Sequence, residues 1–232
     1  MLKTLLAQGF QVDFRSHAKA ILQLDFPAVA DQLEEVLSTS TIPIEEIIGS
    51  GSGETKGTQR LRRALKERGW AKHIFVVQRT IDGVPREAQS HEVDHIRTFE
   101  GRTVALEIEW NNKDPFFDRD LENFKRLHAD GAISLGIIVT RGAALQDALK
   151  SLVGRFADQH AIESQDDLDR LGIAPTPKQR AAIRKRVSRD SKPISFRQAW
   201  VENFVSNKFG AATTHWAKLA DRAASTILAC SC

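Results

Sequence analysis

The N-terminal part of the chain has the apolar spacing of short amphipathic helices. Up to about residue 49, apolar residues recur every three or four positions, and each group follows a residue that favours a helix start, namely Ser16, Pro27 or Pro43. A glycine-rich loop and a basic helix follow over residues 49–70. The loop lacks the Gly-Lys-Ser/Thr order of a phosphate-binding loop, and no apolar strand leads into it. This region is therefore predicted to be helical.

The pattern changes to that of β-strands after residue 70. Two tight-turn signals, Asp82-Gly83 and Glu100-Gly101, divide the next segment into strands over residues 73–81, 84–98 and 103–110. Consecutive strands joined by such short turns are expected to pair in antiparallel hairpins.

A helix and a further strand are expected next. Asp118 or Asp120 can cap the helix, and Gly131 can end it. Residues 132–140 form a continuous apolar run, which is typical of a strand that is buried on both faces. A strand, a helix and a buried strand in this order predict a parallel pair joined by a right-handed crossover.

Beyond this strand the pattern becomes helical again. Four helices are expected, over residues 143–157, 177–189, 195–208 and 214–227. One of them carries an apolar stripe that favours a packed core over a platform for stacked bases. The stripe consists of Phe196, Trp200, Phe204 and Val205.

Length and composition fit the mixed α/β architecture that this pattern predicts. With 232 residues, the chain is long enough for one domain over residues 1–232, with a core at about 49–141 and a helical part at about 143–232. Its cysteines, Cys230 and Cys232, are too close together to frame a fold. The sequence has no signal-like start and no apolar run of membrane-spanning length, so we expect a cytoplasmic protein without membrane contact.

Charge is unevenly distributed along the chain, although the net charge is only +3. Acidic residues dominate from 92 to 130, whereas lysine and arginine dominate from 171 to 197. A basic stripe separate from an acidic focus can bind a polyanion and place metal ions between the two. For the basic stripe alone, a solvated helix face is the alternative interpretation.

The acidic focus contains a hairpin in which carboxylates are expected to meet. A two-residue turn after Phe99 places Asp94 opposite Glu107 and Glu92 opposite Glu109. Because side chains alternate between faces, these carboxylates are predicted to share one face. The other face then carries Val93, Val104, Leu106 and Ile108. Like charges this close repel unless a cation lies between them, and hard divalent ions prefer oxygen ligands.

Two other interpretations apply to these polar residues. A solvent-facing hairpin would pair its acids with Arg97, Arg102 and Lys113. However, the hairpin is expected to be central in the sheet, where an acidic patch without a function is costly. A zinc site would need ligand spacing that is missing among the nearby histidines, so these are expected to be neutral polar residues. They are His91, His95 and His128.

The order of these motifs resembles the core of the PD-(D/E)xK nucleases, in which the last motif position is usually Lys. The segments SHEVDH (90–95) and EIEWNNKDPFFDRDLENFKRLH (107–128) are similar to the BglII and BamHI group of type II restriction endonucleases, a Glu-x-Glu variant. The resemblance is most specific from about 49 to 141. It implies a restriction-endonuclease-like fold, with a mixed β-sheet flanked by helices.

The resemblance also implies an activity and its partners. Such an enzyme is a homodimer that uses Mg²⁺ to cut both strands of double-stranded DNA at a short palindromic site, leaving 5′-phosphates. A GATC-centred palindrome is the site that the resemblance suggests. Asp94 and Glu107 match the metal-binding acids, and Glu109 matches the position where Lys is common. Glu54 is the candidate for a further acid contributed by a preceding helix.

The chemistry of phosphodiester cleavage suggests roles for these residues. Cleavage needs an activated water, neutralisation of charge on the phosphate and a stabilised leaving oxygen. Asp94, Glu107 and the carbonyl of Ile108 can hold one Mg²⁺, while Glu109 orients or deprotonates the water or binds a second metal. Candidate DNA-binding residues are Arg60, Arg63, Lys113, Lys178, Arg184 and Lys185.

Two alternatives for the function stay open. A nuclease with the same core could act in repair or recombination, and a flanking methyltransferase gene would argue against that alternative. A non-catalytic DNA-binding protein could instead use the acids as a structural metal site. Incubation of a plasmid with the protein and Mg²⁺ separates these possibilities.

Overall fold

The chain folds into two compact units. The computed structural model describes residues 1–49, 54–110, 112–113, 115–189, 191–208, 213 and 215–228. The first unit combines residues 1–40, 58–142 and 214–232, and the second combines residues 41–57 and 143–213. Each unit has a hydrophobic core of its own. None of the described helices is long and apolar enough to cross a membrane.

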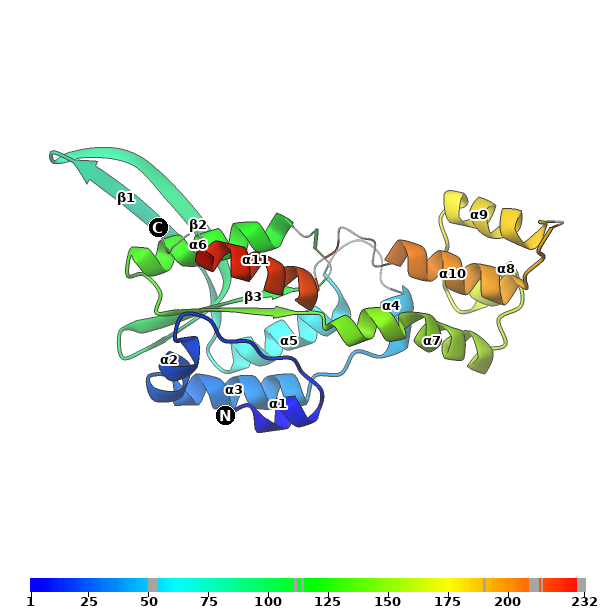
Figure 1. Ribbon diagram of the computed structural model, residues 1–232, viewed down its shortest axis with the longest axis horizontal. Coiled ribbons are helices and arrows are strands. Elements are labelled where there is room, and N and C mark those ends of the chain that lie inside the picture. Colours follow the sequence, from blue (N-terminus) through cyan, green and yellow to red (C-terminus); the bar gives the residue numbers. More distant parts are fainter. Residues whose placement is uncertain are drawn as a thin grey trace. The chain divides into compact units, whose positions relative to one another are not determined.

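The first unit is built on a four-stranded sheet (Figure 1). Its strands lie side by side in sequence order, as β1 (Ala71–Ile81), β2 (Val84–Phe99), β3 (Arg102–Glu109) and β4 (Leu135–Thr140). β2 is antiparallel to β1 and β3, whereas β4 runs parallel to β3. β2 and β3 are therefore the inner strands, and helix α6 (Pro115–Ala129) connects the parallel pair, as predicted.

The two hairpin turns have the backbone conformation that their sequences favour. All residues of Asp82-Gly83 and Glu100-Gly101 have positive φ, between 48° and 78°. Two successive residues with positive φ form a type I′ turn, whose twist matches that of the flanking strands. Glycine adopts this conformation without strain, which explains its place in both turns.

The predicted hairpin register holds near the second turn and breaks further away. Phe99 faces Arg102, and His95 faces Leu106, as predicted. The pairing of β1 with β2, however, shifts in the stretch of β1 from Ala71 to His73. An irregularity of this kind disrupts the alternation of side chains between the two faces of a sheet.

The break in register changes the environment of Val93. This residue packs in a cluster with Ala105 and Phe124, whereas Val104 and Leu106 belong to a different cluster. The prediction that Val93 shares a face with Val104 and Leu106 is therefore wrong. The cause is the irregular pairing between β1 and β2, where extra chain length interrupts the alternation of side chains between faces. The pattern of the β2–β3 hairpin alone does not reveal this irregularity.

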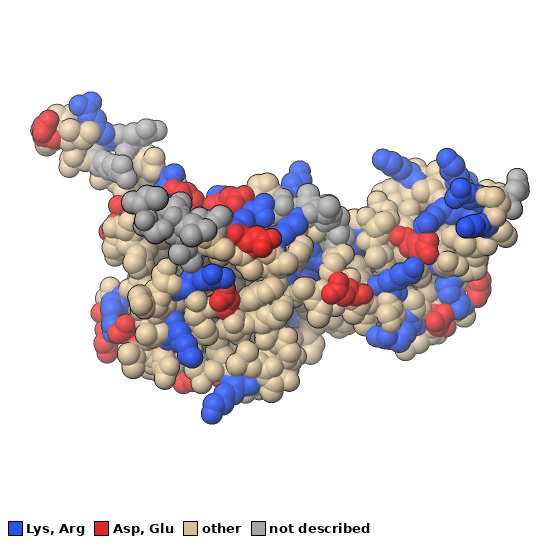
Figure 2. All heavy atoms as spheres, viewed as in Figure 1, with Lys and Arg blue, Asp and Glu red and all other residues tan. Residues whose placement is uncertain are grey.

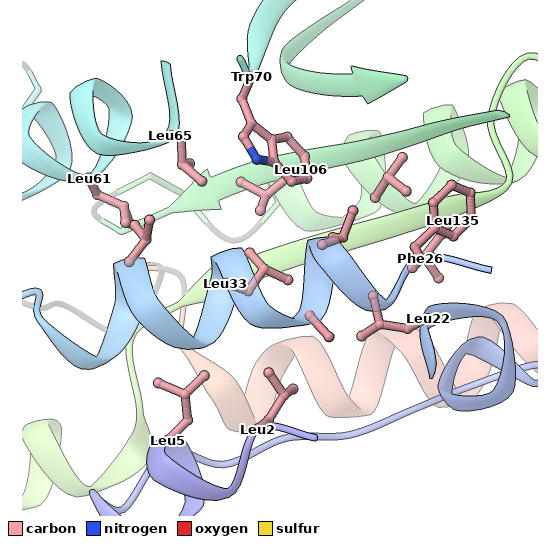
Figure 3. Close-up of a cluster of buried hydrophobic side chains, with 14 residues drawn as sticks. Leu2, Leu5, Leu22, Phe26, Leu33, Leu61, Leu65, Trp70, Leu106 and Leu135 are labelled. Atoms are coloured by element: carbon pink, nitrogen blue, oxygen red, sulfur yellow. The ribbon is translucent and has the colours of Figure 1, made fainter. Parts of the chain in front are cut away.

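Helices pack against the sheet through two hydrophobic clusters. α3 (Pro27–Ser38) and α5 (Lys56–Glu67) contribute Leu33, Leu61 and Leu65 to the cluster that includes Leu106 of β3 (Figure 3). The short helices α1 (Lys3–Ala7) and α2 (Ala18–Leu24) join the same cluster.

The other cluster lies between the sheet and α6. Phe124 and Leu127 of α6 pack there with Val93 and Ala105. Helix α11 (Trp216–Leu228) contacts α6, and Arg222 Nε of α11 lies 2.9 Å from Oδ1 of Asp118 (Figure 1). A mixed sheet flanked by helices is the fold class that the sequence predicts.

Two predictions about this unit are wrong in detail. α6 begins at Pro115, so neither Asp118 nor Asp120 caps it. Proline suits the first position of a helix because the amide that it lacks would have no partner there.

β4 is an edge strand of the described sheet, and Leu135 is its one fully buried residue, so the expected burial of this strand on both faces is not met.

The second unit is helical. Its core draws apolar residues from α4 (Ile44–Gly49), α7 (Ala143–Gln159), α8 (Gln165–Arg170), α9 (Pro177–Val187) and α10 (Phe196–Lys208). Trp200 is 2% exposed, and the other residues of the predicted stripe pack against this core, which confirms the stripe as a packing surface. Basic side chains gather over α9 (Figure 2).

Candidate active site

Two carboxyl groups of β3 and one of α6 are buried together. Glu107, Glu109 and Asp120 are 5%, 2% and 1% exposed, and we call these three residues the acidic cluster. Ala105, Glu107 and Glu109 occupy alternate positions of β3, and Ala105 packs against α6, so this face of β3 points toward α6. Asp120 meets the two glutamates from the opposite side, in the second turn of α6.

Each glutamate of the acidic cluster accepts a hydrogen bond from a neighbouring segment. The backbone N–H of Asp94 donates to Glu107 Oε1 over 3.2 Å. Nδ2 of Asn112 donates to Glu109 Oε2 over 2.6 Å, and the Thr140 hydroxyl donates to the backbone carbonyl of Glu109 over 2.8 Å. These bonds fix the glutamates in place and bring Asp94 beside Glu107, the neighbour that the hairpin register predicts.

Arg119 offsets part of the negative charge of Asp120. Nε of Arg119 donates to Asp120 Oδ1 over 2.8 Å, and its guanidinium also lies 3.7 Å from Glu109 Oε1. Asp120 Oδ2 is buried without a hydrogen-bond partner in the described part of the chain. One guanidinium therefore faces more than one carboxyl group and cannot neutralise all of them if they ionise.

Burial raises the pKa of every member of the acidic cluster. The pKa of Glu107 rises to about 8, first because its carboxylate is desolvated and then because Asp94 and Asp120 repel it. Desolvation also raises the pKa of Glu109 to about 8, and the hydrogen bond with Asp120 adds to the increase. The pKa of Asp120 is likewise raised by desolvation. The cluster therefore retains protons near neutral pH unless a cation replaces them.

Asp94 and Glu92 have exposed side chains, with 54% and 53% of their surface accessible. Nζ of Lys72 lies 2.7 Å from Glu92 Oε1 and 4.0 Å from Asp94 Oδ1. The β2–β3 ladder ends at His95, so Glu92 pairs with β1 rather than with Glu109. The predicted pairing of Glu92 with Glu109 is therefore wrong, because the irregular pairing of β1 with β2 places Glu92 opposite Ile74 instead.

The histidines near the acidic cluster are polar residues of the interior. His91 Nδ1 lies 2.9 Å from Oδ1 of Asn123, and His95 Nδ1 lies 3.3 Å from the carbonyl oxygen of Leu106. Desolvation lowers the pKa of His95, so its ring is neutral at physiological pH. Across the described residues, no three His, Cys, Asp or Glu side chains are grouped to hold a metal ion.

The other predicted residues lie outside the acidic cluster. Glu54 precedes α5, has an exposed side chain and belongs to the second unit. Lys113 is exposed in the segment after β3, and the side chain of Ile108 packs against the cluster that contains Leu106. The predicted DNA-binding residues of the helices are Arg60 and Arg63 on α5 and Lys178, Arg184 and Lys185 on α9. Their roles, and that of the Ile108 carbonyl, stay predictions.

Sequence reasoning missed Asp120, Arg119 and Asn112. Asp120 occurs at helical spacing with the buried residues Phe117 and Phe124 of α6. An acid within an otherwise apolar stripe is a signal that could have identified it, because a buried carboxyl without a use is costly. Arg119 and Asn112 carry no comparable signal, since their contacts depend on how α6 packs beside β3.

A family model described as restriction endonuclease BglII/BglIII matches residues 10–230. Searches of the curated proteins and of the solved structures gave no match. The matched range contains the whole sheet, α6 and all members of the acidic cluster. The chain belongs to this family of restriction endonucleases, and it is therefore a type II site-specific deoxyribonuclease, a hydrolase that binds and cuts double-stranded DNA.

Proposed function

We propose that this restriction endonuclease is a Mg²⁺-dependent homodimer that cuts both strands of a short palindromic site and leaves 5′-phosphates. The observation that carries the proposal is the acidic cluster, with the exposed carboxylate of Asp94 beside Glu107. Burying such acids on an inner strand costs free energy. Such burial is typical of catalytic sites, where the acids coordinate a metal ion or transfer protons.

The chemistry of these residues fits a magnesium ion. Carboxylate and carbonyl oxygens are the ligands that Mg²⁺ prefers, and the raised pKa values mark a place where positive charge is needed. Mg²⁺ usually binds one or two carboxylates and keeps several waters or phosphate oxygens, so it needs no cage of three side chains. Asp94, Glu107 and the carbonyl of Ile108 are the proposed ligands. When bound, the ion supplies charge that stabilises the reacting phosphate and makes the attacking water more acidic.

Glu109 is proposed to orient the attacking water and accept its proton. Asn112 holds one carboxylate oxygen of Glu109, which fixes the direction of the side chain. With Mg²⁺ bound nearby, its charge would favour the ionised form of this buried group, which could then accept a proton from water. The water oxygen bonds to phosphorus, the bond from phosphorus to the 3′-oxygen breaks, and solvent protonates the departing oxygen. The phosphate therefore stays on the 5′ end of the product.

Basic residues are proposed to hold the DNA backbone while the acidic cluster acts on one phosphate. A two-fold symmetric dimer meets a palindrome with the same contacts on each strand, which accounts for cleavage of both. Glu54 is proposed as a further acid of the catalytic site. The side chain of Arg60 is partly buried, and those of the other proposed backbone contacts are exposed. These contacts are Arg60, Arg63, Lys113, Lys178, Arg184 and Lys185.

Digestion of a plasmid tests this function. With Mg²⁺ the protein should give discrete fragments that DNA ligase rejoins without prior phosphorylation, and sequenced ends should fall in a palindrome. A chelator should stop the reaction. Glu107→Gln should be inactive, whereas Glu100→Gln, at a position 87% exposed in the adjacent turn, should cut normally. A smear would indicate non-specific cleavage, and an intact plasmid would refute the proposal.

A further inference from the structure

Lys72 brings a positive charge to the exposed side of the proposed active site. It lies on β1 between Ala71 and His73, where the pairing with β2 shifts. Its Nζ atom is 2.7 Å from Glu92 Oε1 and 4.0 Å from Asp94 Oδ1. The step from Ala71 to His73 on β1 faces a longer step on β2, from Val93 to Ile96, so the irregularity lies in the part of β2 that carries Asp94, beside Lys72.

Lys72 and Arg119 both contact acids of the site, but they are held differently. Arg119 donates to Asp120, which is 1% exposed, so a change of partner would leave a buried carboxylate without its cation. The side chain of Lys72 is 57% exposed, and its acidic partners are similarly accessible. Ion pairs between exposed groups contribute little to stability. Lys72 can therefore exchange partners at low cost, whereas Arg119 cannot.

The difference in burial among the acids indicates where a DNA phosphate approaches. Glu107 and Glu109 are almost fully buried, whereas Asp94 is 54% exposed. A phosphate that shares a cation with Asp94 therefore arrives beside Lys72. The flexible stem of a lysine ends in an ammonium with three donors, which suits a phosphate oxygen. The ammonium would also offset the repulsion between the phosphate and the neighbouring carboxylates.

Resting on the function proposed above, we propose that Lys72 is a catalytic residue. When DNA binds, its ammonium moves from Glu92 to the scissile phosphate and stabilises the charge that grows there during cleavage. Glu92 keeps the ammonium at the site while DNA is absent. Lys72 retains its protons throughout, so the step changes hydrogen-bond partners and makes or breaks no covalent bond.

Rates of a single turnover test this role in the full chain. The substrate is a plasmid that the wild-type protein cuts, with cleavage followed in Mg²⁺ and binding followed in Ca²⁺. Lys72→Met should slow cleavage roughly ten- to a hundredfold, the effect of losing one charged hydrogen bond, while binding changes much less. Lys72→Arg should recover most of the rate. Lys19→Met removes the same charge from an exposed position on α2 and should cut like the wild type.

A double-mutant cycle tests the role of Glu92. Glu92→Gln releases the ammonium and should change the cleavage rate when Lys72 is present. In a Lys72→Met background the same substitution should have almost no effect, because its partner is absent. An equal effect of Glu92→Gln in both backgrounds would mean that Glu92 acts only through its charge on the DNA, which overturns the proposed exchange.

The outcomes separate this inference from the proposed function. If Lys72→Met cuts as fast as Lys19→Met, the inference fails while Mg²⁺-dependent cleavage stands. Equal losses in binding and in rate would make Lys72 a simple DNA contact and overturn its catalytic role. If the wild type leaves the plasmid intact in Mg²⁺, both fail. A thermal melt of each variant checks that it is folded. If Lys72→Met does not fold, Lys72→Gln takes its place, and the same loss of rate is expected for it.

Discussion

Replacing Glu107 with glutamine should stabilise the metal-free protein at alkaline pH while it abolishes cleavage. The substitution keeps the size of the side chain and an oxygen that accepts the N–H of Asp94. It removes the carboxyl group that must ionise inside the fold. A residue needed for activity is thus expected to lower the free energy of unfolding when no metal is bound.

The magnitude follows from the raised pKa of Glu107. This pKa moves from 4.5 to about 8, so the folded protein holds a proton that the unfolded chain has released. Stability therefore falls as pH rises from about 4.5 through about 8, and the loss is complete above the folded pKa. At about 1.4 kcal/mol per pKa unit, the upper limit is about 5 kcal/mol. Part of this loss arises from repulsion that Glu107 shares with Glu109 and Asp120. We therefore expect Glu107 alone to lower the free energy of unfolding by roughly 2 to 4 kcal/mol.

Thermal melts in EDTA at pH 5 and pH 8.5 measure this effect. The wild-type Tm should fall more steeply with pH than that of Glu107→Gln, which should melt at least about 5 °C higher at pH 8.5. Glu100→Gln, with its exposed side chain, serves as the control and should follow the wild type. Parallel pH profiles for the wild type and Glu107→Gln would refute the claim that this carboxyl group is protonated in the fold.

Four further outcomes are expected. Asp94→Ala and Glu107→Ala should each abolish cleavage while stability does not fall much, because each removes a proposed metal ligand and relieves repulsion. A near wild-type rate on a gel would contradict the assignment. Glu109→Lys should retain more activity than Glu109→Ala but less than the wild type. Each tenfold difference in rate corresponds to about 1.4 kcal/mol of activation barrier. An alanine variant as fast as the wild type would show that Glu109 is only a structural residue. Ca²⁺ should support DNA binding without turnover, since it accepts looser coordination than Mg²⁺, and efficient cleavage in Ca²⁺ would count against the site. Sedimentation should detect a dimer on DNA that contains the site, and a monomer there would exclude the symmetric arrangement.

Local chemistry explains what the sequence predicts correctly. The Glu100-Gly101 turn sets the hairpin register by itself, because a type I′ turn leaves one way for the flanking strands to pair. From His95 to Phe99 that register is the observed one, and it brings Asp94 to Glu107. The four helices predicted after residue 143 are observed for the same reason, since spacing within one helix needs no distant partner, whereas the short helix α8 was not predicted.

Contacts between distant segments explain the failures. The shift near Lys72 belongs to the pairing of β1 with β2, so the pattern of the β2–β3 hairpin cannot reveal that Glu92 pairs with Ile74 of β1. The burial of Asp120 depends on the packing of α6 beside β3, which a position suitable for a helix cap concealed. Neither unit is one continuous stretch of chain, and no change in composition marks where the chain passes from one to the other.

The discontinuity of the first unit also has a consequence for biosynthesis. The sheet and α6 are complete in the nascent chain by residue 140, but α11, which contacts α6, leaves the ribosome only after the whole helical segment of the second unit. The first unit is therefore completed only after the helical segment of the second unit has been made, although most of its residues are made before that segment.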